Sequence, residues 1–382
     1  MRETSKPYKI AFLVDSYSRG GVALALQTLL HFLAQEDYAI TLFVKNYDAG
    51  NMLSLPDNMI CLPWPAATFS LHSRLLKLFH WRNYGRKVVY QARSLQNFPG
   101  EFDCAIAYQM ISNDVTVATL EKVCAKRKLL WLHGKKNYSD KDLPFYDTLY
   151  AQADQIVCVS LDTEIRFQRL MPKCAQKTIT IHNLYDVESI LQRSNAVAEG
   201  MDLSNTVPTI VSVGRISAEK GFDRAPAVAR KLADEGYNFR WYIVGDGNKK
   251  TEIQQDIQER NVADRVHLLG YRANPYPYIR NCDIYVQPSY SEGFCTSTME
   301  AKILGKPVVT TDVPGMREQF TDGENGLIVE SSVDGIFGGI KRLLDDPRLR
   351  TKIEENLRNE APHNDKVLAQ TKAVIEGRPT EQ

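Results

Sequence analysis

Short apolar runs alternate with segments of helical period along most of the chain. In the first half, the runs that predict buried strands cover residues 9–14, 38–44, 102–108, 128–132, 155–160 and 177–181. In the second half, they cover residues 209–215, 239–244, 266–272, 282–288, 307–310 and the end of 322–329. Helical patterns lie between them, among others at residues 22–33, 224–234 and 343–358. Continuous apolar strands separated by helices are typical of parallel sheets covered on both faces.

This order of elements predicts an α/β protein with two Rossmann-like domains that face a central cleft. A polar stretch at 187–205 reads as the linker between them. We therefore expect an N-terminal domain at residues 1–186 and a C-terminal domain at 187–358. Residues 359–382 then hold a last helix and a tail. Because ligands of such sheets bind beyond the carboxyl ends of the strands, residues that follow a strand are the candidates for a site.

One such segment, residues 291–311, combines two acids, a glycine, a helix start and a strand. Thr296 and Ser297 are good N-cap residues, and Ser297 with Glu300 has the spacing of a capping box, so a helix should begin here and end at Gly305. The start of a helix directs backbone N–H groups at one point, which suits a phosphate. Glu292 and Glu300 would flank that phosphate and accept hydroxyl groups, as a sugar nucleotide requires. The plainer interpretation is that Glu300 only caps its helix and Glu292 is a solvated loop acid.

Other candidates follow strands elsewhere. Arg215, at the end of the strand predicted at 209–215, and Lys220 bracket a short loop, so both cations can reach one diphosphate. The glycine pair Gly20 and Gly21 follows the first strand, where a diphosphate could approach the backbone or a tight turn could lie. His133 stands at the end of the strand at 128–132, although a lone histidine is more often structural.

Composition narrows the class. The 382 residues are 43% hydrophobic and 24% charged, without a signal peptide or an apolar run that would span a membrane, which indicates a soluble cytoplasmic protein. The seven cysteines never form a C-x-x-C pair, which favours a reducing compartment and no zinc site. Residues 1–185 hold 22 Lys and Arg against 16 Asp and Glu. No nucleic-acid motif accompanies that charge, so we expect no nucleic acid as a partner.

Much of the basic character lies in residues 58–100, which contain six Lys and Arg and no acid, interleaved with Leu, Phe and Trp. Such a segment could lie on an anionic membrane surface, which would make the protein peripheral on the inner face of the cell membrane. An ordinary helix with a solvated basic face is the equal alternative.

The Glu-x7-Glu pair of Glu292 and Glu300, followed by Gly-Lys-Pro-Val-Val at 305–309, resembles the donor-site motif of family 4 retaining glycosyltransferases of the GT-B fold. The Gly-Arg-x5-Gly-Phe segment at 214–222 resembles the same family. This chain departs from the family in having Phe294-Cys295 where Phe-Gly is usual, and in lacking an acid after Gly20-Gly21. The match is weakest at residues 47–100.

The resemblance implies a nucleotide-sugar donor, a glycan or lipid-linked acceptor, no metal or other cofactor, and a C-terminal helix that crosses back to the N-terminal, acceptor-side domain. It assigns the departing diphosphate to Arg215 and Lys220, the ribose to Glu300, the donor sugar to Glu292, and the sugar near the broken bond to His133. The other residues that it places around the donor are Gly20, Gly21, Gly245, Tyr271, Arg272, Gly293, Phe294, Cys295 and Thr296.

The hypothesis is thus a retaining transferase that moves a hexosyl or N-acetylhexosaminyl unit from a nucleoside diphosphate sugar, expected to be a UDP-sugar, in cell-envelope polysaccharide or glycolipid assembly. A sugar-nucleotide epimerase or hydrolase on the same fold and a non-catalytic, transferase-like partner subunit are the alternatives. The sequence leaves the donor sugar, the acceptor and the oligomeric state open.

Overall fold

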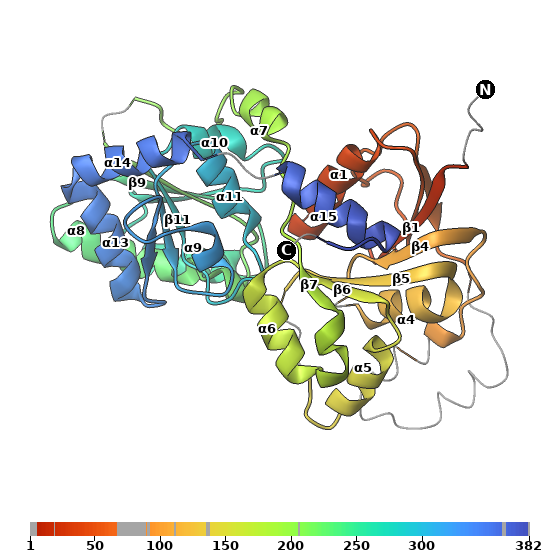
Figure 1. The fold of residues 1–382 in the computed structure, drawn as a ribbon. Helices are drawn as coiled ribbons and strands as arrows, with labels where there is room; N and C mark the ends of the chain where they lie inside the picture. The colour runs from red at the N-terminus through yellow and green to blue at the C-terminus, as the bar shows by residue number, and fades with distance from the viewer. Residues whose placement is uncertain are drawn as a thin grey trace. The chain divides into compact units, whose positions relative to one another are not determined.

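The structure is a computed structural model that describes residues 6–18, 20–66, 89, 92–110, 112–134, 138–204, 207–360 and 364–380. The chain forms two compact units, one of Met1–Tyr185 with His363–Gln382 and one of Asp186–Pro362 (Figure 1). Each unit is a parallel sheet covered by helices. The predicted α/β fold with two Rossmann-like units is therefore confirmed.

In the N-terminal unit, the described residues form a seven-stranded sheet in the order β3-β2-β1-β4-β5-β6-β7. Its strands are β1 (Tyr8–Val14), β2 (Tyr38–Val44), β3 (Ile60–Pro63), β4 (Glu101–Ala107), β5 (Cys124–Leu132), β6 (Gln155–Cys158) and β7 (Thr178–Thr180). Its helices are α1 (Gly21–Leu33), α4 (Asn113–Lys122), α5 (Leu143–Tyr150), α6 (Leu161–Leu170), the 3₁₀ helix η1 (Pro172–Lys177) and α15 (Asn364–Glu376). Residues 10–14 of β1 are fully buried, because helices cover both faces of the sheet.

The C-terminal unit has, over its described residues, a six-stranded sheet in the order β10-β9-β8-β11-β12-β13. Its strands are β8 (Thr209–Val213), β9 (Arg240–Val244), β10 (Val266–Gly270), β11 (Ile284–Gln287), β12 (Val308–Thr311) and β13 (Leu327–Val329). Its helices are α7 (Val187–Arg193), η2 (Ala218–Lys220), η3 (Phe222–Arg224), α8 (Ala225–Asp234), α9 (Lys250–Glu259), α10 (Tyr276–Arg280), α11 (Thr296–Ile303), α12 (Met316–Gln319), α13 (Val333–Asp345) and α14 (Pro347–Arg358).

The last helix, α15, packs on the N-terminal unit, beside α1 in Figure 1. The Tyr8 hydroxyl donates to the Ile375 carbonyl at 3.0 Å, and Arg127 Nε donates to the Val374 carbonyl at 2.9 Å. Lys372 forms an ion pair with Glu36 at 2.6 Å. The predicted return of the C-terminal helix to the first unit is confirmed by these contacts.

The segment predicted to be helical at 343–358 is helical except at Asp346, which separates α13 from α14. Pro347 cannot donate the backbone hydrogen bond that a continuous helix would need. Asp346 instead caps the new helix, since its carboxylate accepts the Leu349 N–H at 3.0 Å.

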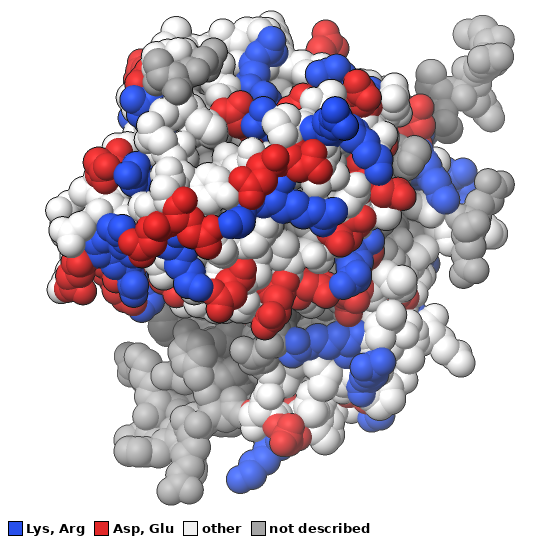
Figure 2. Space-filling view, turned by 90° about the vertical axis from the view of Figure 1, so that its left-hand side faces the viewer, with Lys and Arg blue, Asp and Glu red and all other residues white. Residues whose placement is uncertain are grey.

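Figure 2 shows the face of the C-terminal unit that lies at the left of Figure 1, where acidic and basic side chains are interspersed. Ion pairs in this unit include Lys231 with Asp334 and Lys341 with Glu235. Acidic and basic side chains are thus mixed on this face rather than gathered in patches of one sign. In the parts of the chain that the structure describes, no helix is both long and apolar enough to cross a membrane.

Candidate active site

The central feature of the C-terminal unit is the point where its strand order reverses, between β8 and β11. The carboxyl ends of two such strands leave room for a ligand because the chain runs away from that point in opposite directions. Arg215 and Lys220 follow β8, and Glu292 follows β11. The two loops are joined by a backbone hydrogen bond from Tyr290 to the Glu219 carbonyl at 2.9 Å. The structure therefore brings together residues that lie 72 positions apart.

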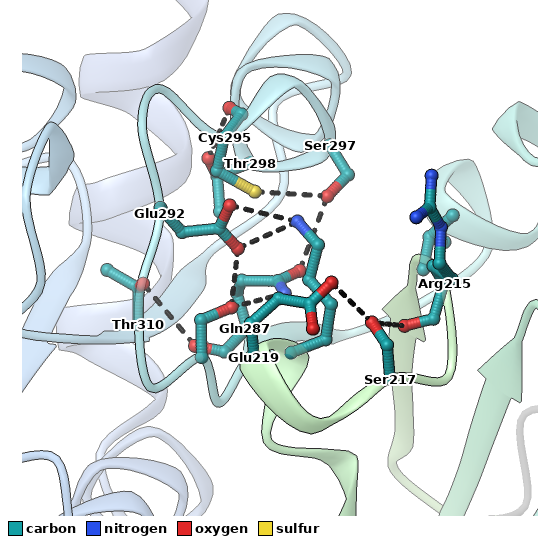
Figure 3. Close-up of polar contacts among 12 residues, drawn as sticks. Arg215, Ser217, Glu219, Gln287, Glu292, Cys295, Ser297, Thr298 and Thr310 are labelled. Atoms are coloured by element: carbon teal, nitrogen blue, oxygen red, sulfur yellow. Dashed lines mark hydrogen bonds and ion pairs between the residues drawn. The ribbon is translucent and has the colours of Figure 1, made fainter. Parts of the chain in front are cut away.

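Lys220 and Glu292 form an ion pair at this point. Lys220 Nζ lies 2.8 Å from Glu292 Oε1 and 2.9 Å from Oε2. The Ser289 hydroxyl donates to the same carboxylate at 2.5 Å (Figure 3). The Lys220 side chain is 21% exposed, and the Glu292 side chain is 8% exposed. Burial disfavours the charge on Lys220, but the neighbouring Cys295 sulfur and Glu292 carboxylate outweigh it and raise the pKa of Lys220, so the ammonium stays charged.

Polar side chains below this pair form a connected ladder that the sequence analysis missed. The Tyr285 hydroxyl donates to Gln287 Oε1 at 3.0 Å, and Gln287 Nε2 donates to Ser289 Oγ at 2.9 Å. All three side chains are buried. A signal was present in the sequence, because alternate residues of a strand share a face and polar residues at 285, 287 and 289 interrupt an otherwise apolar run. The ladder fixes Ser289, which in turn holds the Glu292 carboxylate.

The helix start at α11 lies where it was predicted, but the capping box is wrong. Cys295 is the N-cap, and no side chain caps the helix. The Ser297 hydroxyl donates instead to Gln287 Oε1 at 3.3 Å, and Glu300 accepts from Tyr276. The buried ladder takes the Ser297 hydroxyl, which leaves the first-turn N–H groups of α11 without a side-chain cap. Such groups suit an anion.

Glu300 is half-buried and accepts one hydrogen bond, from the Tyr276 hydroxyl to Oε1 at 3.3 Å. Burial raises the pKa of Glu300 to about 7, although the Tyr276 hydrogen bond and the charges of Arg193 and Lys220 oppose the rise. Near neutral pH this carboxyl group therefore exists in both protonation states. Tyr276 was not among the predicted site residues.

Arg215 differs from Lys220 in being exposed. In Figure 3 its side chain extends away from the hydrogen-bonded cluster, and its guanidinium takes part in none of the contacts drawn. Among the residues that the structure describes, no hydrogen bond or ion pair of this guanidinium is found. A guanidinium in this position is able to bind an anion from solution.

Position 245 requires a glycine because two backbone segments approach each other closely there. Gly245 has φ 153°, and a Cβ atom there would lie 1.8 Å from the Gly214 carbonyl oxygen. The turns after β8 and β9 therefore touch at their glycines. This contact holds Arg215, the next residue, at the carboxyl edge of the sheet.

The remaining predicted donor residues of this unit lie in two loops. Gly293, the buried Phe294 and Cys295, and the half-buried Thr296 lie in the loop before α11 and at its first turn. Tyr271 and Arg272 follow β10, where Tyr271 is 47% exposed. Nothing in their contacts assigns a ligand, so their roles stay predictions.

Gly20, Gly21 and His133 lie in the N-terminal unit. Gly20 has φ 127° and is the N-cap of α1, with Gly21 as its first residue. His133 follows β5 and packs on the Tyr108 ring, with ring centroids 4.5 Å apart. Burial lowers the pKa of His133 to about 3, against a hydrogen bond with the Tyr108 backbone that raises it. The imidazole is therefore neutral at physiological pH and is able to hold a ligand by hydrogen bonds but not by charge.

The basic segment at 58–100 falls largely outside the described residues. Of its six Lys and Arg residues, the structure describes Arg93, whose guanidinium binds the Glu121 carboxylate at 2.7 Å. The other five lie outside the described residues, so the membrane contact stays a prediction.

Comparison with solved structures defines the class of fold. The chain aligns with Alr3699/HepE from Anabaena, solved in complex with UDP and glucose, with a TM-score of 0.74 over 96% of this chain and 99% of that one, at 19% identity. It aligns with sucrose-phosphate synthase from Thermosynechococcus elongatus with a TM-score of 0.73 over 96% and 98%, at 18% identity. The fold is thus GT-B, as the resemblance implied.

Comparison of sequences finds similarity that includes the C-terminal unit. Residues 199–360 match the family model described as glycosyl transferases group 1. One relative is the N-acetylgalactosamine-N,N'-diacetylbacillosaminyl-diphospho-undecaprenol 4-alpha-N-acetylgalactosaminyltransferase of Campylobacter jejuni, which is 33% identical to this chain over 224 residues. The alignment covers 57% of this chain and 58% of the relative. The chain therefore spans somewhat more than half the length of that relative. The solved structures thus define the GT-B fold, and the match to the glycosyl transferases group 1 model lies within the C-terminal unit.

Proposed function

We propose that this protein transfers a hexosyl or N-acetylhexosaminyl unit from a UDP-sugar to a hydroxyl group of a glycan or lipid-linked acceptor, with retention at the anomeric carbon, as in family 4. The observation that carries the proposal is the charged Lys220, held by Glu292 at the reversal of the strand order, beside the exposed Arg215 and the uncapped start of α11. Two cations and a helix start at one sheet edge suit a diphosphate leaving group. The Anabaena neighbour was solved with UDP, which supports uracil as the base.

The proposed chemistry is a single exchange of bonds. The bond from the anomeric carbon to the β-phosphate oxygen breaks, and the acceptor hydroxyl oxygen bonds to that carbon on the same face. The acceptor's proton goes to the departing phosphate oxygen, so no separate general base is needed. Arg215, Lys220 and the first turn of α11 stabilise the negative charge on the diphosphate, Glu292 accepts hydroxyl groups of the sugar, and Glu300 accepts those of the ribose.

The acceptor is proposed from the relatives. The Campylobacter relative carries a diphospho-undecaprenol acceptor in its name, which favours a lipid-linked glycan and hence work at the membrane surface. Sedimentation with anionic vesicles tests the membrane contact of residues 58–100. Full activity on a soluble acceptor without any vesicle binding would contradict it.

Calorimetric titration of the intact protein with UDP, GDP and ADP tests the donor. We expect UDP to bind, and Lys220→Ala to weaken it by at least tenfold through the loss of one charge-assisted contact. Lys231→Ala is the matched control, because it removes an exposed lysine that pairs with Asp334 in the same unit. If no nucleotide binds the intact protein, a non-catalytic partner role replaces this proposal. Nuclear magnetic resonance of the transfer product gives the anomeric configuration and tests retention.

A further inference from the structure

Glu300 is held by a residue outside the set that the sequence indicated. Tyr276, the first residue of α10, is 8% exposed and directs its hydroxyl at Glu300 Oε1, 3.3 Å away. A carboxylate has about four acceptor positions, so one hydrogen bond to Oε1 leaves Oε2 and a further lone pair available. Two neighbouring hydroxyl groups, such as those of a ribose, need two such positions with a fixed orientation.

Tyr276 is itself fixed by the end of α7. The guanidinium carbon of Arg193 lies 4.7 Å from the centroid of the Tyr276 ring, a cation–π contact. Arg193 Nη2 donates to the Ala273 carbonyl at 3.1 Å, and Asn274 Nδ2 donates to the Arg193 carbonyl at 2.8 Å. Arg193 is therefore hydrogen-bonded to Ala273 and Asn274, which lie shortly before α10. These contacts lie in one unit and form a continuous support from α7 to the carboxylate on α11.

We propose that Tyr276 is a positioning residue, held by Arg193, that orients the Glu300 carboxylate for the 2′- and 3′-hydroxyl groups of the donor nucleotide. The inference rests on the proposed function, because it deepens the role of Glu300 at the same site. Tyr276 touches Glu300 and acts through it. Its effect is therefore on nucleotide affinity and ribose discrimination rather than on bond breaking.

The charged and titratable groups around Glu300 favour its ionised form, which accepts hydrogen bonds from hydroxyl groups. Tyr276 on α10, Arg193 at the end of α7 and Lys220 in η2 all favour the ionised carboxylate, against the burial that opposes it. Removal of the Tyr276 hydroxyl should therefore move the titration of Glu300 to higher pH. A residue that only packed in the core would not have this effect.

The test is the dissociation constant of UDP and of 2′-deoxy-UDP for the intact chain, for Tyr276→Phe and for Tyr278→Phe. Tyr278 is the matched control, because it lies on the same helix, is buried, and donates its hydroxyl to the Glu199 backbone carbonyl at 2.9 Å. We expect the intact protein to prefer UDP by about tenfold or more, which is the usual effect of one hydrogen bond to a charged group. Tyr276→Phe should reduce that preference several-fold, whereas Tyr278→Phe should keep it.

A pH series sharpens the readout, since the ratio of the two dissociation constants cancels the titration of the shared diphosphate. In the intact protein the preference should fall as pH drops through about 7, and in Tyr276→Phe this midpoint should lie at higher pH. Arg193→Gln, at an exposed residue, should give a smaller change in the same direction and covers the case in which Tyr276→Phe folds poorly. An unchanged ratio and midpoint in both variants would overturn the inference while leaving UDP binding intact. A failure of UDP to bind the intact protein would overturn the proposed function instead.

Discussion

A titratable group lies near the carboxyl edge of each sheet, and burial shifts the pKa of the two groups in opposite directions. Glu300 of the C-terminal unit has its pKa raised to about 7, and His133 of the N-terminal unit has its pKa lowered to about 3, in each case chiefly because burial disfavours the charged form. Lys220 is half-buried, but its pKa is raised because anionic partners, among them Glu292, outweigh the effect of burial. A charged partner, and not depth alone, therefore decides which group keeps its charge.

The edge of the N-terminal sheet has its own ion cluster, with more solvent exposure. Lys45, the residue after β2, forms ion pairs with Asp114 and with Asp15, the residue after β1. Lys45 Nζ lies 3.3 Å from Asp15 Oδ1. The Lys45 and Asp15 side chains are 40% and 36% exposed, against 8% for Glu292. The residues that match the family model, 199–360, include Lys220 and Glu292.

The largest expected effect comes from breaking the pair in the C-terminal unit. Lys220→Ala should lower transferase activity at least 100-fold, because a cation at the leaving group is lost, and should lower the free energy of unfolding by roughly 3 kcal/mol, because the charge of Glu292 is left buried without a cation to pair with. Steady-state kinetics and chemical denaturation measure the two effects. The double variant Lys220→Ala with Glu292→Ala should recover part of the stability and none of the activity. Equal losses of stability in the single and double variants would show that the pair does not determine the cost.

The next effect concerns the glycine contact that holds Arg215. Gly245→Ala should lower the free energy of unfolding by roughly 3 kcal/mol or more, because a Cβ atom there would overlap the Gly214 carbonyl and the φ of 153° is strained for alanine. Gly236→Ala is the control, since Gly236 has φ 87° and a Cβ there would meet no atom within 4 Å. It should cost about 1 kcal/mol from backbone strain alone. Thermal melting of both variants compares them, and similar losses would contradict the role of the close approach.

A smaller effect comes from the titration of Glu300. Its pKa is raised in the folded chain, so the folded state binds the proton more tightly than the unfolded state between about pH 4.5 and 7. Its contribution to stability is full below pH 4.5 and is lost as the pH rises through 7. Relative to Glu300→Gln, the intact protein should lose about 2 kcal/mol between pH 4.5 and 8, as measured by denaturation at each pH. A difference that stays constant with pH would show that Glu300 is not desolvated.

The smallest effect should have the opposite sign at the N-terminal edge. The pKa of His133 is lowered from 6.5 to about 3, so below pH 6.5 the unfolded state binds a proton that the folded state does not. Relative to His133→Asn, the intact protein should lose roughly 1 kcal/mol as the pH falls from 7 to 5. Opposite pH slopes for Glu300 and His133 would support the comparison, and slopes of the same sign would break it.

The sequence predicted the strands well because a buried parallel strand is apolar throughout and its pattern is local. The segment 38–44 coincides with β2, and the predicted strand at 209–215 begins with β8 and extends two residues beyond its end at Val213. The four-residue strand β3 was not predicted, because half of its residues are exposed and its apolar run is short. The predicted capping box was wrong because the Ser297 hydroxyl donates to a buried side chain, Gln287, that lies outside the helix.

Local patterns were enough to predict the alternation of strands and helices, the two Rossmann-like units and the positions of Arg215, Lys220, Glu292 and Glu300 after or near strand ends. These follow from periodicity and from short motifs, which act over a few residues. The folded structure was needed to establish that Lys220 pairs with Glu292 and that Tyr276 holds Glu300. The contacts between Lys220 and Glu292 and between Tyr276 and Glu300 join different loops and helices of the sheet edge. Their geometry and desolvation depend on how the sheet is assembled, which no local pattern specifies.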